Sequence, residues 1–247
     1  MTNQVEVLRI ISKLKPEVII HAAAYTAVDE CEYEQKKAFE VNSLGAFHVG
    51  IAAKNVGAKM VYISTDYVFD GDKTSPYVEE DQPNPKNVYG MSKWLGEQLV
   101  QLTLEELYVV RTSWLYGSCG KNFVKTMLKL AEQKQEIKVV DDQIGSPTYT
   151  KDLADVIMQI IGKSYGVYHV SNTGSCSWYT FAKHIFKQAG FDPYLIQPTT
   201  TEAYGALAPR PAYSVMAHKS LEKEKLEVPR RWEEAVKEFI KEELRRD

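Results

Sequence analysis

The chain has 247 residues, of which 44% are hydrophobic and 26% charged, and its formal net charge is −3. This composition fits a globular protein that buries a substantial core in one large or two small domains. It contains no basic block, so we expect no nucleic acid as a partner. No secretory signal pattern opens the chain and no apolar run approaches the ~20 residues that cross a bilayer, so we expect no membrane partner. Three scattered cysteines and five histidines without HxxxH or HxH pairs indicate a cytoplasmic protein with reduced thiols and no metal site.

The predicted elements alternate along the chain. A first helical segment, with Thr2 as its expected cap, leads to Pro16. Four short runs are apolar at nearly every position, which is typical of strands buried on both faces of a parallel sheet. These runs are residues 17–25, 58–65, 107–114 and 166–172. Helical patterns lie between or after them, at about 32–56, 88–104, 120–134 and 150–162. This order predicts an α/β fold with a doubly wound parallel sheet.

Polar side chains gather where the first three strands end. These ends read Ala24-Tyr25-Thr26, Ser64-Thr65-Asp66-Tyr67 and Thr112-Ser113-Trp114. Such residues are also common in ordinary turns. Ligands of open α/β sheets, however, bind outside the carboxyl ends of the strands, where the three ends would converge. We therefore favour a binding site at this edge.

The character of the sequence changes after residue 114. Pro-rich segments with short strands, at 137–149, 192–200 and 208–214, predict a smaller lobe built from two separate parts of the chain. Residues 230–246 form an amphipathic helical pattern. Its apolar stripe consists of Trp232, Val236, Phe239 and Ile240.

The segment VYGMSKWLGE, residues 88–97, opens one predicted helix with Tyr89 and Lys93 at positions i and i+4. These positions share a helix face, so the phenol and the ammonium should point the same way, either as a surface pair or as an acid/base device. The same spacing recurs at Tyr33/Lys37 and Tyr179/Lys183. Tyr89 differs from the other two tyrosines because it follows a buried strand that ends in a hydroxyl residue, Thr65.

A strand-end threonine followed by a YxxxK helix resembles the extended short-chain dehydrogenase/reductase family. Within it, the sequence looks like the dTDP-4-dehydrorhamnose reductases, from about residue 3 to the C-terminus. The motifs that carry this resemblance are AAAYTAVDECE (22–32), STDYVFDG (64–71), VYGMSKWLGE (88–97), RTSWLYG (111–117) and SNTGSCSW (171–178). The resemblance implies a Rossmann-type dinucleotide-binding domain and a smaller C-terminal substrate-binding lobe. The expected boundaries are 1–113 with 150–172 for the domain, and 114–149 with 173–247 for the lobe.

The implied reaction is the reduction of dTDP-4-dehydro-L-rhamnose to dTDP-L-rhamnose with NADPH or NADH, and the implied partner is therefore a dTDP-sugar. Tyr89 would donate the proton, Thr65 would polarise the same carbonyl, and Lys93 would hold the nicotinamide ribose. Because free tyrosine has a pKa near ~10, we expect the Lys93 ammonium to lower the pKa of Tyr89. The expected cofactor-binding residues are Ala23, Ala24, Tyr25, Thr26, Ile63, Tyr89 and Lys93. The expected substrate-binding residues are Thr65, Asp66, Tyr67, Trp114, Asn122 and Arg210. The resemblance also allows a homodimer.

Several alternatives stay open at this point. Trp114 offers a flat face to a sugar, with a core aromatic as the alternative, and Arg210 suits a phosphate, with a surface arginine as the alternative. Related dehydratases carry a glutamate in place of Tyr67, and its absence here favours reduction over elimination. The chain could also be another nucleotide-sugar reductase or epimerase of the family. A non-catalytic regulatory paralogue, resembling the methionine adenosyltransferase beta subunit, is the alternative from another class.

The glycine-rich turn of the family is not found in the sequence. None of the fourteen glycines falls into GxGxxG or GxxGxxG spacing, the pattern that places a dinucleotide pyrophosphate on a helix N-terminus. We therefore expect the Rossmann-type sheet to be N-terminally incomplete, by about one βαβ unit of ~30 residues or more. The strand at 17–25 would then lie at an edge of the sheet.

Overall fold

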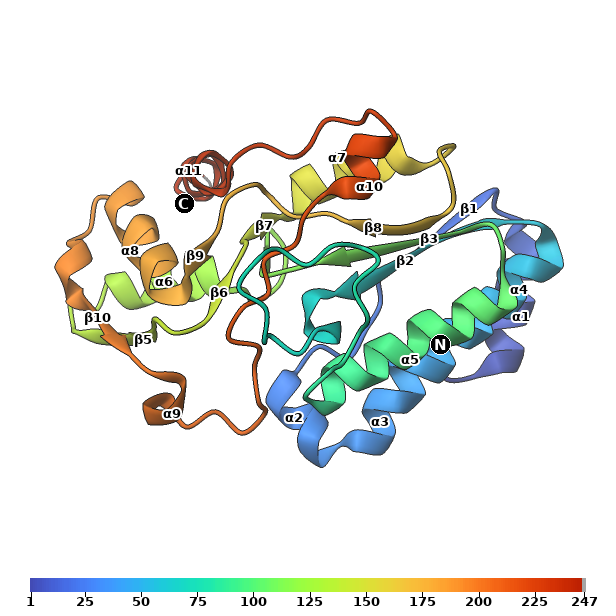
Figure 1. Ribbon diagram of the computed structural model, residues 1–247, viewed down its shortest axis with the longest axis horizontal. Coiled ribbons are helices and arrows are strands. Elements are labelled where there is room, and N and C mark those ends of the chain that lie inside the picture. The colour runs from blue at the N-terminus through green and yellow to red at the C-terminus, as the bar shows by residue number, and fades with distance from the viewer. Residues whose placement is uncertain (246–247) are drawn as a thin grey trace.

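The computed structural model describes residues 1–245, and its centre is a four-stranded parallel sheet (Figure 1). The strand order is β1-β2-β3-β8, and each neighbouring pair is parallel. The strands are β1 (Val18–His21), β2 (Lys59–Thr65), β3 (Leu107–Thr112) and β8 (Gly166–His169). The predicted α/β fold with a parallel sheet is confirmed. β2 ends with its apolar run at Thr65, whereas β1, β3 and β8 end two to four residues before theirs, because the last residues of those runs turn into the loops at the carboxyl edge.

Helices cover both faces of the sheet (Figure 1). Alternate residues of β2 point to opposite faces, so Tyr62 packs in one apolar cluster and Val61 in another. On the first face lie α1 (Gln4–Leu14), α4 (Gly45–Val56) and α5 (Val88–Thr103). On the second face lie α7 (Thr150–Ile160) and α10 (Lys219–Lys223). This double coverage explains why the strands read as continuous apolar runs.

The edge position predicted for the first strand is confirmed, because β1 ends the order of the four-stranded sheet among the described residues. Ile20 of this strand is 48% exposed, and Val5 and Leu14 of α1 are 76% and 69% exposed. The cap of α1 differs from the prediction: Asn3 rather than Thr2 accepts the Glu6 N–H, at 3.1 Å. None of the described helices is long and apolar enough to cross a membrane.

The helical pattern at 32–56 is interrupted rather than continuous. It divides into α2 (Val28–Tyr33), α3 (Gln35–Phe39), the π-helical turn η1 (Glu40–Leu44) and α4. The wide turn directs two buried side chains at α5: Asn42 Nδ2 donates to Ser92 Oγ at 2.9 Å, and Ser43 Oγ donates to the Ser92 carbonyl at 2.7 Å. A π-helical turn is often found beside functional sites, and this one holds the helix that carries Tyr89.

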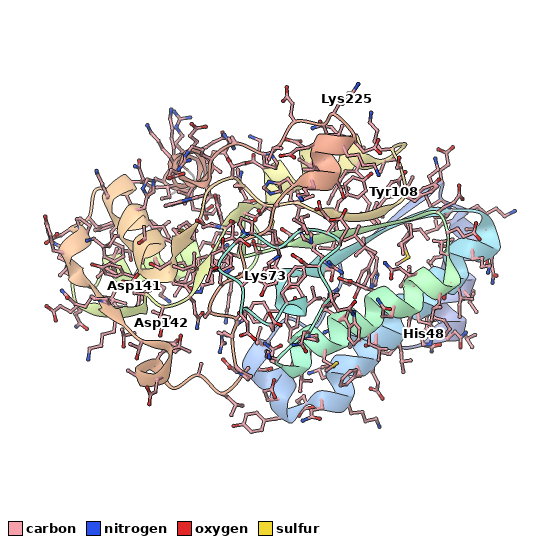
Figure 2. All side chains as sticks on the ribbon, viewed as in Figure 1. His48, Lys73, Tyr108, Asp141, Asp142 and Lys225 are labelled. Carbon is pink, nitrogen blue, oxygen red and sulfur yellow. The ribbon has the colours of Figure 1, made fainter. Side chains whose placement is uncertain are left out.

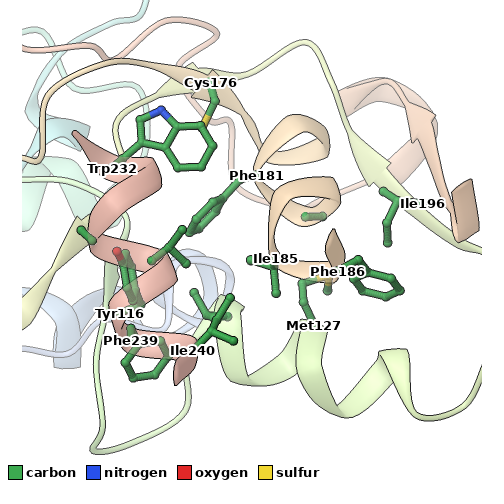
Figure 3. Close-up of a cluster of buried hydrophobic side chains, with 14 of the residues drawn as sticks. Tyr116, Met127, Cys176, Phe181, Ile185, Phe186, Ile196, Trp232, Phe239 and Ile240 are labelled. Carbon is green, nitrogen blue, oxygen red and sulfur yellow. The ribbon is translucent and has the colours of Figure 1, made fainter. Parts of the chain in front are cut away.

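A second part of the molecule follows β3 and has its own apolar core (Figure 3). Phe181 lies in the middle of it, with Trp232 edge-on at 5.6 Å between ring centroids. All four residues of the predicted C-terminal stripe are buried in this core. Its helices are α6 (Phe123–Ala131), α8 (Trp178–Gln188) and α11 (Trp232–Glu243). Its paired strands are β4 (Leu115–Tyr116) with β7 (Thr148–Tyr149), β5 (Ile137–Val140) with β10 (Ile196–Thr199), and β6 (Ile144–Gly145) with β9 (Cys176–Ser177).

Two carboxylates directly after β5, Asp141 and Asp142, each accept a hydrogen bond from another segment of this second part (Figure 2). Asp142 accepts the backbone N–H of Thr201, at 2.9 Å, at the start of the short helix α9 (Thr201–Tyr204). Asp141 accepts a hydrogen bond from Ser177 Oγ, which also caps α8. Within residues 1–245 two 3-10 turns occur, η2 (Asp66–Val68), directly after β2, and η3 (Pro193–Leu195). The ends of β2 and β3 line one cavity together with residues of the second part, and the candidate site lies there.

Candidate active site

A cavity of about 450 Å³ opens at the carboxyl ends of the parallel strands. It is walled by the strand ends and the start of α5 on one side, and by residues 112–122, Thr150 and Trp178 on the other. Ten of the residues predicted for the site line it together: Ala24, Thr26, Ile63, Thr65, Asp66, Tyr67, Tyr89, Lys93, Trp114 and Asn122. The convergence expected from the strand ends is therefore present in the structure.

Tyr89 is fixed by the way in which α5 begins. The side chain of Asn87 caps this helix by accepting the Gly90 N–H at 2.7 Å. Gly90 itself approaches the chain after β2 so closely that a Cβ on it would lie 2.1 Å from the carbonyl oxygen of Tyr67. A residue without a side chain is therefore required directly after Tyr89. The contact places the Tyr89 ring edge-on to the Tyr67 ring, with 5.7 Å between centroids.

Thr65 lies at the last position of β2 and forms a small hydrogen-bonded unit with the residues that follow it. Its hydroxyl donates to Asp66 Oδ1 at 3.1 Å and accepts the Tyr67 N–H at 3.2 Å. The Asp66 side chain is almost fully buried, and burial raises the pKa of its carboxyl to about 6. Near neutral pH this carboxyl is thus closer to accepting a proton than an ordinary aspartate.

Lys93 lies one turn after Tyr89 and only 2% of it is exposed. Its ammonium donates to the carbonyl oxygen of Ile63 at 2.7 Å and lies 4.1 Å from the centre of the Tyr62 ring. Burial lowers the pKa of Lys93 to about 7, against the opposing negative charge of Glu97. The ammonium therefore begins to lose its proton close to neutral pH.

The expected effect of Lys93 on Tyr89 is not seen in the structure. Burial raises the pKa of the Tyr89 phenol, and the group that opposes this rise is the Thr65 hydroxyl rather than the Lys93 ammonium. The sequence spacing could not reveal this, because it places the two side chains on one helix face without showing that the ammonium turns toward the Ile63 carbonyl. The phenol is consequently protonated at neutral pH, which suits a proton donor.

The two other YxxxK pairs lie elsewhere. Lys183 Nζ donates to the Tyr179 hydroxyl at 3.3 Å on α8, where both residues are half-buried, and Tyr33 is 78% exposed. Neither tyrosine lines the cavity at the strand ends. A direct phenol–ammonium contact therefore occurs at a half-buried pair outside the cavity. Inside the cavity, burial shifts the pKa values of both Tyr89 and Lys93.

Trp114 lies beside the cavity in a strained backbone conformation, with φ of 47°. Its indole stacks on that of Trp178, with 3.5 Å between centroids and 8° between planes. Gly145 allows this arrangement, because a Cβ there would lie 2.6 Å from the Trp114 ring. Trp178 lines the cavity and was not among the predicted site residues. It ends the motif SNTGSCSW, but nothing in the sequence shows that it meets Trp114.

Three predicted site residues lie outside this cavity. Ala23 lines a separate apolar cavity between α1 and β1, and the Tyr25 hydroxyl donates to Glu30 at 2.8 Å. Arg210 lines an adjoining cavity of about 350 Å³, which shares Tyr67 and Trp178 with the main one.

Arg210 and Asn122 both have partners within the protein. The Arg210 guanidinium binds Asp29 in bidentate fashion, with Nη1–Oδ1 and Nη2–Oδ2 distances of 3.1 and 2.8 Å. Asn122 lines the main cavity but also caps α6, by accepting the Lys125 N–H at 3.1 Å. Its amide nitrogen donates to the Gly117 carbonyl at 2.8 Å.

Comparisons with known proteins identify the family of the chain. The family description "RmlD substrate binding domain" matches residues 1–245. The spore coat polysaccharide biosynthesis protein SpsK of Bacillus subtilis is 50% identical over 228 residues, which cover 92% of this chain and 80% of that protein. A dTDP-4-dehydrorhamnose reductase of Aggregatibacter actinomycetemcomitans is 41% identical over 249 residues, covering 96% of this chain and 85% of the relative.

A solved crystal structure is also similar to this chain in fold and in sequence. The dTDP-4-dehydrorhamnose reductase of Bacillus anthracis, in complex with NADP, superposes with a TM-score of 0.95 at 48% identity. The superposition covers 98% of this chain and 86% of that one. The family match, the identities and the site at the strand ends together show that the chain belongs to the dTDP-4-dehydrorhamnose reductase family.

Proposed function

We propose that the protein reduces dTDP-4-dehydro-L-rhamnose to dTDP-L-rhamnose with NADPH or NADH. The observation that supports this most directly is the cavity in which Thr65, Tyr89 and Lys93 meet beside the face of Trp114. The first three residues provide a hydroxyl donor, a phenol and an ammonium for a carbonyl that becomes an alcohol. The tryptophan provides an apolar surface for a sugar ring.

The proton chemistry follows from the burial of these groups. As the keto carbon of the sugar is reduced, its oxygen develops negative charge and must gain a proton. Tyr89 holds that proton at neutral pH because burial raises the pKa of its phenol. Thr65 can stabilise the same oxygen when its hydroxyl turns from Asp66 Oδ1 to the substrate. The ammonium of Lys93 provides positive charge one helix turn away from the phenol.

The strand ends also fit a nicotinamide cofactor, which supplies the hydride when it is bound. The small side chains of Ala22 and Ala24 line the cavity beside Ile63 and leave room for a flat ring against the backbone. The Lys93 ammonium has three donors, of which one goes to the Ile63 carbonyl, so it can also hold a ribose hydroxyl.

The adjoining cavity is suited to the nucleotide end of the substrate. It is mainly apolar and is lined by Phe123, Met127 and Val139, with Lys138 and Arg210 as cations. A base can pack on the apolar wall while the cations attract the diphosphate. This supports the assignment of residues 1–113 and 150–172 to the cofactor and of 114–149 and 173–247 to the substrate. A homodimer and a cytoplasmic location stay predictions.

The test is direct. The purified protein is mixed with dTDP-4-dehydro-L-rhamnose and either NADPH or NADH, the loss of reduced cofactor is followed by absorbance, and the product is identified by mass spectrometry and NMR. Formation of dTDP-L-rhamnose supports the proposal. Stoichiometric binding of cofactor and dTDP-sugar with no turnover would refute it and would favour the regulatory alternative. Reduction of a different keto-sugar nucleotide in preference would identify another reductase of the family.

A further inference from the structure

A buried ion pair lies directly behind the proposed catalytic residues. Glu97 is fully buried on α5, one turn after Lys93, and it pairs with Arg111 of β3, which is 3% exposed. Arg111 Nε and Nη2 donate to the two carboxylate oxygens at 3.1 and 2.8 Å. Ser64 Oγ of β2 donates to the same carboxylate. One side chain thus ties the helix to two strands of the sheet.

The positions of these three residues are specific to the site. Ser64 and Arg111 are opposite each other in the parallel pairing of β2 with β3. Ser64 directly precedes Thr65 and directly follows Ile63, whose carbonyl accepts the Lys93 ammonium. Tyr62 completes the contact by donating its hydroxyl to the Lys93 backbone carbonyl at 3.2 Å. Any shift of α5 along β2 would therefore move Lys93 and Thr65 relative to each other.

Stability alone gives a weak reason for such a pair. Removing two charges from water is costly, and well-packed apolar residues of similar volume often hold a fold as well or better. The apolar clusters on both faces of the sheet show that this part of the molecule is otherwise held by such packing. The ion pair adds a fixed hydrogen-bond geometry and a negative charge close to Lys93.

We propose that Glu97, braced by Arg111 and Ser64, is a positioning residue that sets the register of Lys93 against Thr65 and helps to keep the Lys93 ammonium charged. The inference rests on the proposed function for its kinetic readout. The titratable and charged groups that act on Lys93 directly are His21 of β1, Tyr62 of β2 and Glu97 of α5. Asp66 and Tyr67 of η2 and Tyr89 of α5 line the same cavity, and Arg111 of β3 lies behind Glu97.

The direction of the effect follows from these groups. Burial already lowers the pKa of Lys93 to about 7, and Glu97 opposes that change. Loss of the Glu97 charge would lower it further and would leave the Arg111 guanidinium without its carboxylate. A reaction that needs charged Lys93 would then fail at a lower pH than in the unchanged protein.

The test uses Glu97→Gln, which keeps the size and one oxygen acceptor of the side chain but removes its charge. We expect kcat at neutral pH to fall roughly 10-fold or more, as for loss of a charge-assisted contact, with KM for the sugar nucleotide little changed. The alkaline limb of the pH–kcat profile should move down by about one pH unit. Asp152→Asn is the matched control, because Asp152 also accepts two hydrogen bonds from an arginine, Arg230, but lies outside the cavity. It should lower the melting temperature without moving the pH limb.

Two further measurements keep the proposal falsifiable. If Glu97→Gln does not fold, Ser64→Ala removes one of the three hydrogen bonds, and it should lower kcat severalfold while the melting temperature changes by only a few degrees. The affinity for NADPH is titrated by fluorescence across pH, and this needs no sugar substrate. The proposal would be overturned if the folded Glu97→Gln variant shifted neither the alkaline limb of the pH–kcat profile nor the pH dependence of the affinity for NADPH. Failure of the unchanged protein to reduce the sugar would instead refute the proposed function and leave the NADPH titration to decide the role of Glu97.

Discussion

Replacement of Tyr89 by phenylalanine tests the central assignment with the smallest structural change. The ring stays, so its edge-on contact with Tyr67 at 5.7 Å and the start of α5 should be kept. The group that is lost is the phenolic hydroxyl beside Thr65, the proton source in the proposed reaction. Loss of a general acid typically costs ~10²-fold or more in turnover, which corresponds to about 2.7 kcal/mol in the activation barrier. We expect that loss in kcat with an almost unchanged KM.

The assay compares Tyr89→Phe with Tyr179→Phe under steady-state conditions. Tyr179 is the matched control because it has the same spacing to a lysine, Lys183, whose ammonium contacts its hydroxyl at 3.3 Å. This pair is half-buried on α8 and lies outside the cavity at the strand ends, so the control should keep nearly full activity. Both variants are checked for folding by thermal melting. Equal losses of kcat in the two folded variants would refute the assignment of Tyr89 as the proton donor.

Three other measurements test the site and the fold. Trp114→Ala should weaken the binding of the sugar nucleotide by on the order of 1–3 kcal/mol, by analogy with base stacking on aromatic side chains. Calorimetry measures this, and unchanged affinity in a folded variant would make Trp114 a core residue. Gly90→Ala should lower the melting temperature by several degrees, because the new Cβ would lie 2.1 Å from the Tyr67 carbonyl oxygen. A variant as stable as the parent would contradict that geometry. Burial lowers the pKa of His21 to about 4 and that of His169 to about 3. In the unfolded chain both imidazoles take up a proton as the pH falls below ~6.5, before they do so in the folded protein. The free energy of unfolding should therefore decrease between pH ~6.5 and pH ~4. The raised pKa of Asp66 has the opposite effect, because this carboxyl takes up a proton in the folded protein first. Denaturant titrations that show equal free energies of unfolding at pH 7 and pH 4.5 would contradict the expected net loss of stability.

The sheet and the grouping of residues at its edge could be predicted from the sequence for a physical reason. Strands covered on both faces need apolar residues at nearly every position, and this pattern needs no knowledge of partners distant in the chain. The carboxyl ends of parallel strands necessarily meet at one edge. The strand-end residues Thr65 and Trp114 therefore meet in one cavity with Tyr89, whatever the details of the loops between them.

The contacts within the site could not be predicted in the same way. The stacking of Trp178 on Trp114 depends on the left-handed backbone at Trp114 and on the space that Gly145 leaves. The ammonium of Lys93 turns to the Ile63 carbonyl because the end of β2 passes beside α5 at that height. Helical periodicity fixes the face on which a side chain lies, but it does not fix which of several polar groups on that face becomes its partner.

Arg210 shows that the chemistry of a residue type leaves the identity of its partner open. A guanidinium was expected near the substrate phosphates, and the structure gives it a carboxylate, Asp29, from a residue 181 positions earlier in the chain. Both partners present two oxygens to the same planar fork of donors, so the residue type alone does not separate them. The pairing holds the segment around Ala208 against α2, because Asp29 also accepts the Ala208 N–H at 3.0 Å. Asp29 thereby fixes the guanidinium at the rim of the adjoining cavity, where an incoming diphosphate would have to share Arg210 with it or displace it.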